Sequence, residues 1–239
     1  MDKDLNEPGT LNLEWMEGDM PYSTAFGDHF YCRTDGRAEC GHVFLAGNGL
    51  PERWHQGGTF TIGELGFGTG LNFCETWRVW KSRDAQLKSL QANLHFISFE
   101  LYPMDRDSIG KAIGRWPEIA AERQALLDQW PDRPSGIVDL QMDDSVRLTV
   151  VCGEALENVR ASEEMFDAWY LDGFAPSRNG AMWSPELMKA VFDHTKDDGT
   201  FATYAAAGFV RRNLVAAGFR VERRPGFAGK REMLAGTKV

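Results

Sequence analysis

The stretch Thr61-Ile62-Gly63-Glu64-Leu65-Gly66-Phe67-Gly68-Thr69-Gly70-Leu71-Asn72-Phe73 decides which fold this chain is expected to adopt. A short apolar run ends at the carboxylate of Glu64, glycines follow at positions 66, 68 and 70, and a helical apolar pattern resumes at Leu71. This order predicts a strand, a tight turn and a helix. In doubly wound α/β folds such turns lie at the carboxyl edge of a parallel sheet, where ligands bind.

The spacing of the glycines indicates which kind of ligand the turn suits. A dinucleotide fingerprint needs G-x-G-x-x-G, whereas this chain has E-x-G-x-G-x-G with no Lys or Arg beside it. A ligand with an amino group and a sulfonium fits better, because Glu64 can face positive charge while the glycines let the backbone approach closely. The pattern resembles the first motif of class I S-adenosylmethionine-dependent methyltransferases. An ordinary glycine turn without a ligand is the alternative.

Composition limits the other possibilities. The 239 residues, 43% of them hydrophobic, suffice for one large domain or one domain with an elaborated edge. No apolar run is long enough to span a bilayer, and the segment from Met1 to Asp4 does not resemble a signal peptide, so we expect a cytoplasmic protein without membrane association. The four cysteines form no C-x-x-C pair and the five histidines are scattered, so no metal site is predicted.

The net charge of −9 argues against a nucleic-acid partner. The distribution of charge weakens this argument, since the chain from residue 211 onward carries eight basic residues and only two acidic ones, Glu222 and Glu232. The basic residues are Arg211, Arg212, Arg220, Arg223, Arg224, Lys230, Arg231 and Lys238. They can form one basic face on an acidic body, or simply a solvated surface.

The region before the glycine turn contains short apolar segments separated by glycine and proline. Period-two residues near Leu13, then Phe30 to Cys32, then His42 to Ala46, read as short strands. We therefore predict an N-terminal β-rich cap, residues 1–57, packed on a catalytic domain of residues 58–239. The loop that starts at Gly47 brings Asn48, which could line a pocket.

Two further strands are predicted to end in acidic turns. Leu94 to Glu100 is a buried strand whose terminal carboxylate suits the two hydroxyls of a ribose, or only caps the end of the strand. Residues 137–141 and 147–151 form a predicted hairpin, whose second arm leads into Gly153-Glu154-Ala155 and a helix. There an acceptor could meet an adenine amino group, or the turn could bind nothing. Between these strands, residues 105–130 are predicted to be helical, with a break at Pro117.

A second informative stretch runs from Phe166 to Pro176. A buried strand delivers Asp172 to the same edge, and Gly173 and Phe174 begin a loop beside the glycine turn. An acidic residue among apolar neighbours costs desolvation energy, which favours a functional role over a decorative one. Beyond it we predict a helix at 184–194, a strand at 199–204, a helix at 208–217 and an antiparallel pair at 219–223 and 232–236 that closes the sheet.

Together these motifs resemble one family closely. The matching strings are Gly47-Asn48, Glu64 to Phe73, His95 to Glu100, Asp172-Gly173-Phe174-Ala175-Pro176, Ala207 to Arg212 and Lys230 to Leu234. They are similar to the methyltransferase domain of the bifunctional tRNA 5-methylaminomethyl-2-thiouridine biosynthesis proteins (MnmC) and to its stand-alone counterpart (MnmD). The similarity covers nearly the whole chain, and the FAD-dependent oxidase half of the bifunctional proteins is missing from it.

The resemblance implies a class I, Rossmann-like α/β fold and a methyl transfer from S-adenosylmethionine. The acceptor would be the amine of 5-aminomethyl-(2-thio)uridine at the wobble position, in the anticodon loop of tRNA. Asp172 would accept a hydrogen bond from that amine, orient it and take its proton. The cofactor would be held by Glu64, Gly66, Phe67, Gly68, Thr69, Gly70, Asn72, Glu100, Gly153, Glu154 and Ala155. The substrate would be held by Tyr31, Asn48, Phe174, Arg211, Arg212, Lys230 and Arg231, the four basic residues contacting phosphate.

Other functions stay open at this stage. A class I methyltransferase of a small-molecule amine would suit the acidic surface, and a non-catalytic S-adenosylmethionine-binding partner of a separate oxidase would explain the glycine turn. A nicotinamide-dependent dehydrogenase is disfavoured by the glycine spacing. The aminomethyl precursor would come from a separate FAD-dependent oxidase acting upstream, or by another route.

Overall fold

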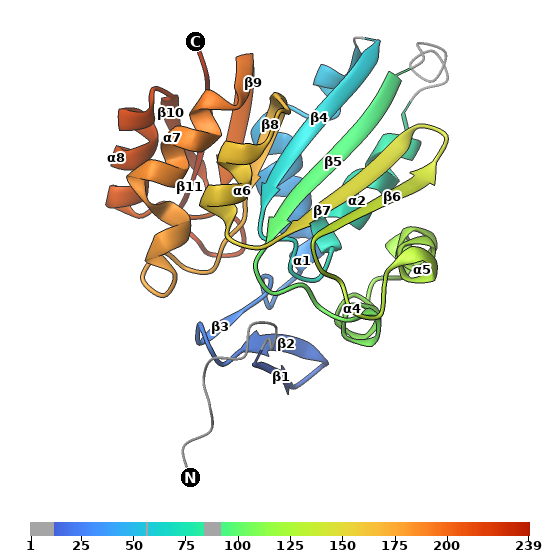
Figure 1. Cartoon of the computed structure of the whole chain (residues 1–239). Helices are drawn as coiled ribbons and strands as arrows, with labels where there is room; N and C mark the ends of the chain where they lie inside the picture. Colours follow the sequence, from blue (N-terminus) through green and yellow to red (C-terminus); the bar gives the residue numbers. More distant parts are fainter. Residues whose placement is uncertain (1–11, 56, 84–91) are drawn as a thin grey trace.

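The main sheet of the protein has eight strands in the order β10-β11-β9-β8-β4-β5-β7-β6. The computed structural model describes residues 12–55, 57–83 and 92–239. The strands are β4 (Gly58–Leu65), β5 (Ala92–Glu100), β6 (Ile137–Asp143), β7 (Val146–Cys152), β8 (Phe166–Leu171), β9 (Thr195–Thr203), β10 (Arg220–Pro225) and β11 (Glu232–Thr237). Strands β4, β5, β7, β8 and β9 pair in parallel, while β6, β10 and β11 pair antiparallel. This confirms the predicted sheet and its closing antiparallel pair (Figure 1).

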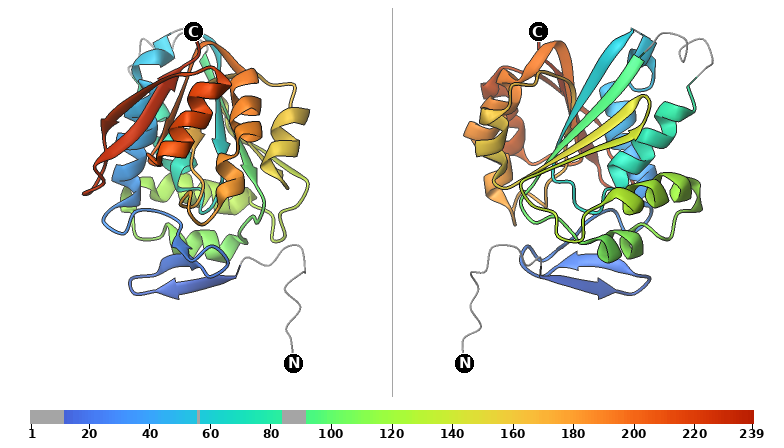
Figure 2. Two further views of the ribbon diagram at one scale, coloured as in Figure 1. Left: turned by 90° about the vertical axis from the view of Figure 1, so that its left-hand side faces the viewer. Right: turned by 45° about the vertical axis from the view of Figure 1, so that its right-hand side comes forward.

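Helices cover both faces of this sheet. The helices α6 (Ala155–Ala161), α7 (Pro185–Asp193) and α8 (Gly208–Ala217) lie side by side on one face, as the left view of Figure 2 shows. The other face carries α2 (Leu71–Lys81) and, next to it, α5 (Ala120–Gln129). The predicted break at Pro117 separates α4 (Arg106–Ala112) from a short 3-10 turn (Pro117–Ile119) that leads into α5.

Alternation along β8 explains why both faces are covered. Trp169 and Leu171 belong to the hydrophobic cluster under α6, α7 and α8, while Tyr170 between them belongs to the cluster under α2. All three side chains have 0% exposure. Because successive side chains of a strand point to opposite faces, a strand buried on both sides reads as one continuous apolar run. Each large apolar side chain buried in this way contributes roughly 1.5–3 kcal/mol to stability.

The N-terminal region is only half as predicted. A small antiparallel sheet of β1 (Leu13–Met16), β2 (Met20–Ser23) and β3 (Asp28–His29) is present. The expected strands at Phe30–Cys32 and His42–Ala46 are wrong. Residues 30–32 form an irregular segment, and the next elements are helical: α1 (Gly36–Glu39), a π-helix (Cys40–Leu45) and 3-10 helices at Ala46–Asn48 and Glu52–His55.

The missed helix has identifiable signals. Asp35 caps α1, since its side chain accepts hydrogen bonds from the backbone N–H groups of Arg37 and Ala38. Val43, Phe44 and Leu45 are all buried, and a short apolar run of this kind cannot be assigned to strand or helix by periodicity alone. The helical part of the predicted cap packs into the same hydrophobic cluster as α2. Residues 1–11 of that cap lie outside the described residues.

The small sheet stands beyond the carboxyl edge of the main sheet, as Figure 1 shows. It is tied there by Asp28, whose Oδ2 accepts a hydrogen bond from the backbone N–H of Ala175 at 2.9 Å, and by an ion pair between Asp19 and Lys111 at 3.3 Å. The N-terminal region therefore adds a wall at the edge where ligands are expected. Within the described ranges, no helix is long and apolar enough to cross a membrane.

Candidate active site

A cavity of about 720 Å³ opens where the chain connections change direction along the sheet. From β4 the chain runs through α2 to β5 on one side, whereas β8 and β9 lie on the other side of β4. Such a switch point leaves a crevice beyond the carboxyl ends of the two central strands. The volume lies within the usual range of small-molecule sites. The lining comes from the loops after β4, β5, β7, β8 and β9 and from the N-terminal region.

The glycine turn packs directly against the loop that follows β8. Gly66 has a φ of 92°, and a Cβ at this position would lie 2.5 Å from the backbone oxygen of Asp172. Only glycine permits both the backbone conformation and this approach. The prediction that Asp172 lies beside the glycine turn is therefore confirmed. Gly68 and Thr69 also line the cavity, while Gly70, with a φ of 72°, forms the N-cap of α2.

The carboxyl group of Asp172 reaches the cavity with one oxygen already bonded. Its Oδ2 accepts a hydrogen bond from Asn72 Nδ2 at 2.6 Å. Burial, and to a lesser degree the charge of Glu39, raise the pKa of Asp172 to about 7 against the opposing effects of the Asn72 hydrogen bond and Lys230. A carboxyl with a pKa near neutrality can both accept and release a proton at physiological pH. Asp172 is thus a suitable general base.

Glu64 lies beneath the cavity rather than in its lining. The residue has 0% exposure; its Oε1 accepts from Asn72 Nδ2 at 3.0 Å and its Oε2 from the Ser98 hydroxyl at 2.7 Å. Burial raises the pKa of Glu64 well above its usual value, and the charge of Asp172 adds to this. Glu64 is therefore not positioned to contact a ligand in the cavity.

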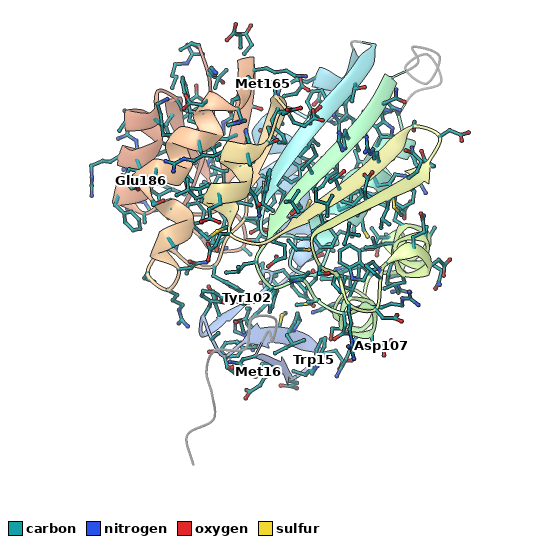
Figure 3. All side chains as sticks on the ribbon, in the orientation of Figure 1. Trp15, Met16, Tyr102, Asp107, Met165 and Glu186 are labelled. Carbon is teal, nitrogen blue, oxygen red and sulfur yellow. The ribbon has the colours of Figure 1, made fainter. Side chains whose placement is uncertain are left out.

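Glu100 is in the position expected for holding a diol. It lines the cavity at the end of β5, its Oε2 accepts from the backbone N–H of Gly68 at 2.8 Å, and its Oε1 accepts from that of Tyr102 at 2.8 Å. Each oxygen keeps further acceptor capacity for a hydroxyl group. Figure 3 shows Tyr102 between the carboxyl edge of the main sheet and the small sheet. Glu154 and Ala155 line the cavity beyond Glu100, and Gly153 forms the turn before them with a φ of 134°.

Aromatic side chains form another part of the cavity wall. Phe174 stacks on Phe26 with ring centroids 4.7 Å apart and meets the edge of Phe30 at 5.1 Å. Phe67 also lines the cavity and stacks on Trp130. Tyr31 lines it too, but its hydroxyl donates to the Ala112 carbonyl at 2.7 Å. The Tyr31 ring is therefore available to a ligand, whereas its hydroxyl is engaged.

Several residues of the site were missed or misassigned from sequence, among them Glu39, Lys230 and Tyr204. Glu39, at the end of α1, lines the cavity and forms an ion pair with Lys230, which was expected to contact phosphate. Tyr204 follows β9, donates its hydroxyl hydrogen to the Gly173 carbonyl at 2.5 Å and carries Lys230 over its ring. Its place after a parallel strand is a signal that could have found it. Glu39 carries no such signal, because it sits in a short helix that sequence reasoning missed.

Four of the expected substrate residues do not line the cavity. Asn48 is 1% exposed and donates its amide hydrogens to the backbone oxygens of Phe44 and Trp169, so it fastens the N-terminal helices to β8. Arg211 and Arg212 lie on α8 and Arg231 in the segment between β10 and β11. Among the described residues, no cluster of three or more His, Cys, Asp or Glu side chains could hold a metal ion.

Comparison with known families decides what kind of site this is. Residues 117–239, slightly more than half of the chain, match the family model of S-adenosyl-L-methionine-dependent methyltransferases. The chain belongs to this family. The methyltransferase is 44% identical over 230 residues to the tRNA 5-methylaminomethyl-2-thiouridine biosynthesis bifunctional protein MnmC of Chromohalobacter salexigens, and 42% identical over 224 residues to that of Caulobacter vibrioides. These alignments cover 94% and 93% of this chain but only 32% and 37% of those proteins, so it spans about a third of their length.

The fold of the methyltransferase also matches a solved structure. The crystal structure of MNMC2 from Aquifex aeolicus superposes with a TM-score of 0.73 over 96% of this chain and 71% of that one, at 18% sequence identity. The residues present fit S-adenosylmethionine. The Gly66 approach to Asp172 leaves no room for a side chain, Glu100 offers two oxygens to a diol, and acidic groups surround a volume that must accept a sulfonium.

Proposed function

We propose that this methyltransferase transfers a methyl group from S-adenosylmethionine to the amine of 5-aminomethyl-(2-thio)uridine at the wobble position of tRNA, giving 5-methylaminomethyl-(2-thio)uridine. The observation that carries the proposal is the position of Asp172, which lies against the glycine turn and faces an aromatic cavity. The identity to proteins named for 5-methylaminomethyl-2-thiouridine biosynthesis supports the choice of substrate.

The cofactor would be held by the acceptors along the carboxyl edge. S-adenosylmethionine supplies a methyl group on a positively charged sulfur, which a nucleophile attacks in line. Glu100 would accept the ribose hydroxyls, and the Glu154–Ala155 turn would meet the adenine. Gly66 and Gly68 allow the backbone to approach closely, with Thr69 and Phe67 alongside. Glu64 would support this arrangement from below through its hydrogen bond to Asn72, which itself lines the cavity.

Asp172 would prepare the acceptor amine. An alkylamine is mostly protonated at neutral pH, judging by the reference pKa of about 10.4 for lysine, so its lone pair must be freed before attack. The ammonium would donate a hydrogen bond to Asp172 and pass its proton to that carboxylate. The freed lone pair could then form the N–C bond while the S–C bond breaks and its electron pair stays on the departing, now neutral sulfur. Holding both reactants in line converts an encounter into a step within one complex.

The aromatic wall would hold the base and exclude water. Phe174, with Phe26 and Phe30 against it, presents ring faces that suit an unstacked uracil. Such rings also attract cations, worth roughly 0.5–2 kcal/mol for an ammonium or sulfonium in contact. Tyr31 would add its ring from the N-terminal region.

The phosphate contacts would fall to the C-terminal arginines. Arg212 on α8 and Arg231 beside β11 are exposed, and Arg211 is half-buried. Lys230 is less suited to phosphate, because its ammonium is paired with Glu39 in the cavity lining. Asn48, buried against β8, would act on the fold rather than on the substrate.

The setting of this reaction is also proposed. The relatives are named as bifunctional proteins, and the aminomethyl group would be produced by a separate FAD-dependent oxidase acting upstream. The described cysteines are free thiols, which suits a cytoplasmic location.

The deciding experiment uses tRNA from cells that lack this protein. The purified chain is incubated with that tRNA and S-adenosylmethionine carrying a labelled methyl group, and the nucleosides are then separated by mass. We expect 5-aminomethyl-(2-thio)uridine to be consumed and its labelled methylamino form to appear. Label that enters small amines but not tRNA would favour the small-molecule alternative. Cofactor binding without transfer to either would favour a non-catalytic partner.

A further inference from the structure

A single amide joins two carboxyl groups of the site, those of buried Glu64 and half-buried Asp172. Asn72, the second residue of α2, donates from Nδ2 to Asp172 Oδ2 at 2.6 Å and to Glu64 Oε1 at 3.0 Å. A primary amide has two donor hydrogens, and both are used here. The three side chains come from the end of β4, the start of α2 and the loop after β8.

The direction of this amide is determined by its neighbours. Its Nδ2 lies within hydrogen-bond distance of both Glu64 Oε1 and Asp172 Oδ2, so the carbonyl end points elsewhere. Oδ2 of Asp172 therefore accepts the hydrogen bond from Asn72, which leaves Oδ1 for a ligand in the cavity. A carboxylate held by one oxygen presents the other in a defined direction, which in-line attack requires.

The amide itself stands on a rigid support. Leu71 and Phe73, on either side of Asn72, are buried in the core, and the preceding Gly70 begins the helix with its backbone N–H bonded to the Phe67 carbonyl. The far carboxyl group, Glu64, is fixed in turn by the Ser98 hydroxyl at 2.7 Å. A side chain on a packed helix holds a neighbour more precisely than one on a loop.

We propose that Asn72 is the positioning residue of Asp172: it fixes which carboxylate oxygen faces the acceptor amine and stabilises the ionised form that takes the proton. This assignment rests on the proposed function, since it takes Asp172 as the base. It gives Asn72 a role beyond contact with the cofactor.

Several other groups act on Asp172 and must be included in any titration. Glu39 and Cys40 approach from the N-terminal helices, Glu64 from β4, Tyr204 from the end of β9 and Lys230 from the segment after β10. Of these, Lys230 favours the ionised form of Asp172 and Glu39 opposes it. Loss of the hydrogen bond from Asn72 destabilises the ionised form of Asp172, so the pKa of Asp172 must rise.

The test compares Asn72→Leu, which keeps the size of the side chain, with Asn72→Asp, which keeps its polarity but exchanges the donor for an acid. Asn72→Leu removes the hydrogen bond to Asp172 at every pH, and Asn72→Asp removes it when the new carboxyl group is ionised. We expect kcat on tRNA to fall about 10- to 100-fold, as for lost positioning of a reacting group. The acid limb of the pH–rate profile should move up by about one pH unit in Asn72→Leu, and further in Asn72→Asp. The dissociation constant of S-adenosylmethionine should change less than about threefold.

The matched control is Asn213→Leu. Asn213 donates its amide hydrogen to the Trp183 carbonyl at 2.8 Å and does not line the cavity, so its loss should leave the acid limb where it is. A fall in cofactor affinity with an unmoved acid limb in both Asn72 variants would overturn the proposal, because Asn72 would then serve the cofactor alone.

A second measurement separates this inference from the proposed function. The titration of the Asp172 carboxyl carbon, followed by NMR in the protein without tRNA, should shift upward in Asn72→Leu and in Asn72→Asp even if wild-type protein methylates no tRNA. An unshifted titration overturns the positioning role, whatever the substrate. Absence of tRNA methylation by wild-type protein, in contrast, overturns only the proposed function.

Discussion

Lys230 Nζ lies 2.8 Å from Glu39 Oε1, and the two residues line one cavity although almost the whole chain separates them. Lys230 comes from the segment between β10 and β11, and Glu39 from α1. The pair also acts on Asp172: the carboxylate of Glu39 raises the pKa of Asp172, and the ammonium of Lys230 lowers it. The N-terminal helix and the C-terminal hairpin thus set the charge around the proposed base.

Removing Lys230 and removing Glu39 should shift the pH–rate profile in opposite directions. In Lys230→Met, Glu39 keeps its charge without its partner, so the pKa of Asp172 rises and the acid limb moves to higher pH. In Glu39→Gln the pKa of Asp172 falls and the acid limb moves to lower pH. The shifts should be about half a unit or more, measured as kcat/KM between pH 5 and 9. Lys189→Met, which removes an exposed ion pair with Asp193, is the control and should leave the profile unchanged. Shifts of the same sign in both variants would contradict this account.

The carboxyl group of Asp172 itself predicts where activity is lost. Because its pKa is raised to about 7, kcat/KM should fall as pH drops below about 7 and the base becomes protonated. Asp172→Asn keeps the shape and removes the base, so kcat should fall about 10²- to 10⁴-fold with little change in cofactor affinity. Turnover assays at several pH values and calorimetric titration with S-adenosylmethionine check both parts. Retained turnover in Asp172→Asn would show that another group accepts the proton.

Local sequence pattern predicted the edge of the sheet but not the contacts across the cavity. Carboxylates at the ends of buried strands led to Glu100 and Asp172, both of which line the site. The same pattern failed for Glu64, because it does not say whether a side chain rises above the turn or packs beneath it. The Glu39–Lys230 pair could not be predicted, since it depends on where a misassigned helix folds back.

Gly66 is expected to be required for the spacing between β4 and the loop after β8. Gly66→Ala meets two penalties, a positive φ and a Cβ 2.5 Å from the Asp172 carbonyl oxygen. Gly58→Ala, with a φ of 94° and nothing within 4 Å of its Cβ, meets only the first. Positive φ costs alanine about 1–3 kcal/mol, so Gly58→Ala should lose about that much and Gly66→Ala clearly more. Chemical denaturation measures both. Equal losses of stability in the two variants would mean that the loop after β8 shifts to accommodate the new Cβ without destabilising the fold.

The proposed phosphate contacts predict a salt dependence. Replacing Arg211 and Arg212 together by alanine should weaken binding of all tRNAs alike. It should also lower the slope of log affinity against log salt by about one for each phosphate that the variant no longer neutralises. Filter binding at several salt concentrations measures this slope. Arg147→Ala is the control, because it removes an exposed arginine of β7 that pairs with Asp139 of β6 at the other end of the sheet. Unchanged affinity in the double variant would remove α8 from the proposed tRNA surface.

Burial of Glu64 predicts a stability that falls with rising pH. Its pKa is raised well above the ordinary value of 4.5, so the folded protein holds a proton that the unfolded chain releases. Between pH 4.5 and the folded pKa the unfolded chain therefore binds fewer protons, and the free energy of unfolding decreases as pH rises.

Glu64→Gln has nearly the same shape, can still accept from Asn72, and carries no titrating group. From pH 4 to pH 7, the melting temperature of Glu64→Gln should therefore rise relative to that of wild type. Other titrating groups are common to both proteins and largely cancel in this difference. A difference that stays constant with pH would mean that Glu64 has the same pKa in the folded and unfolded chain.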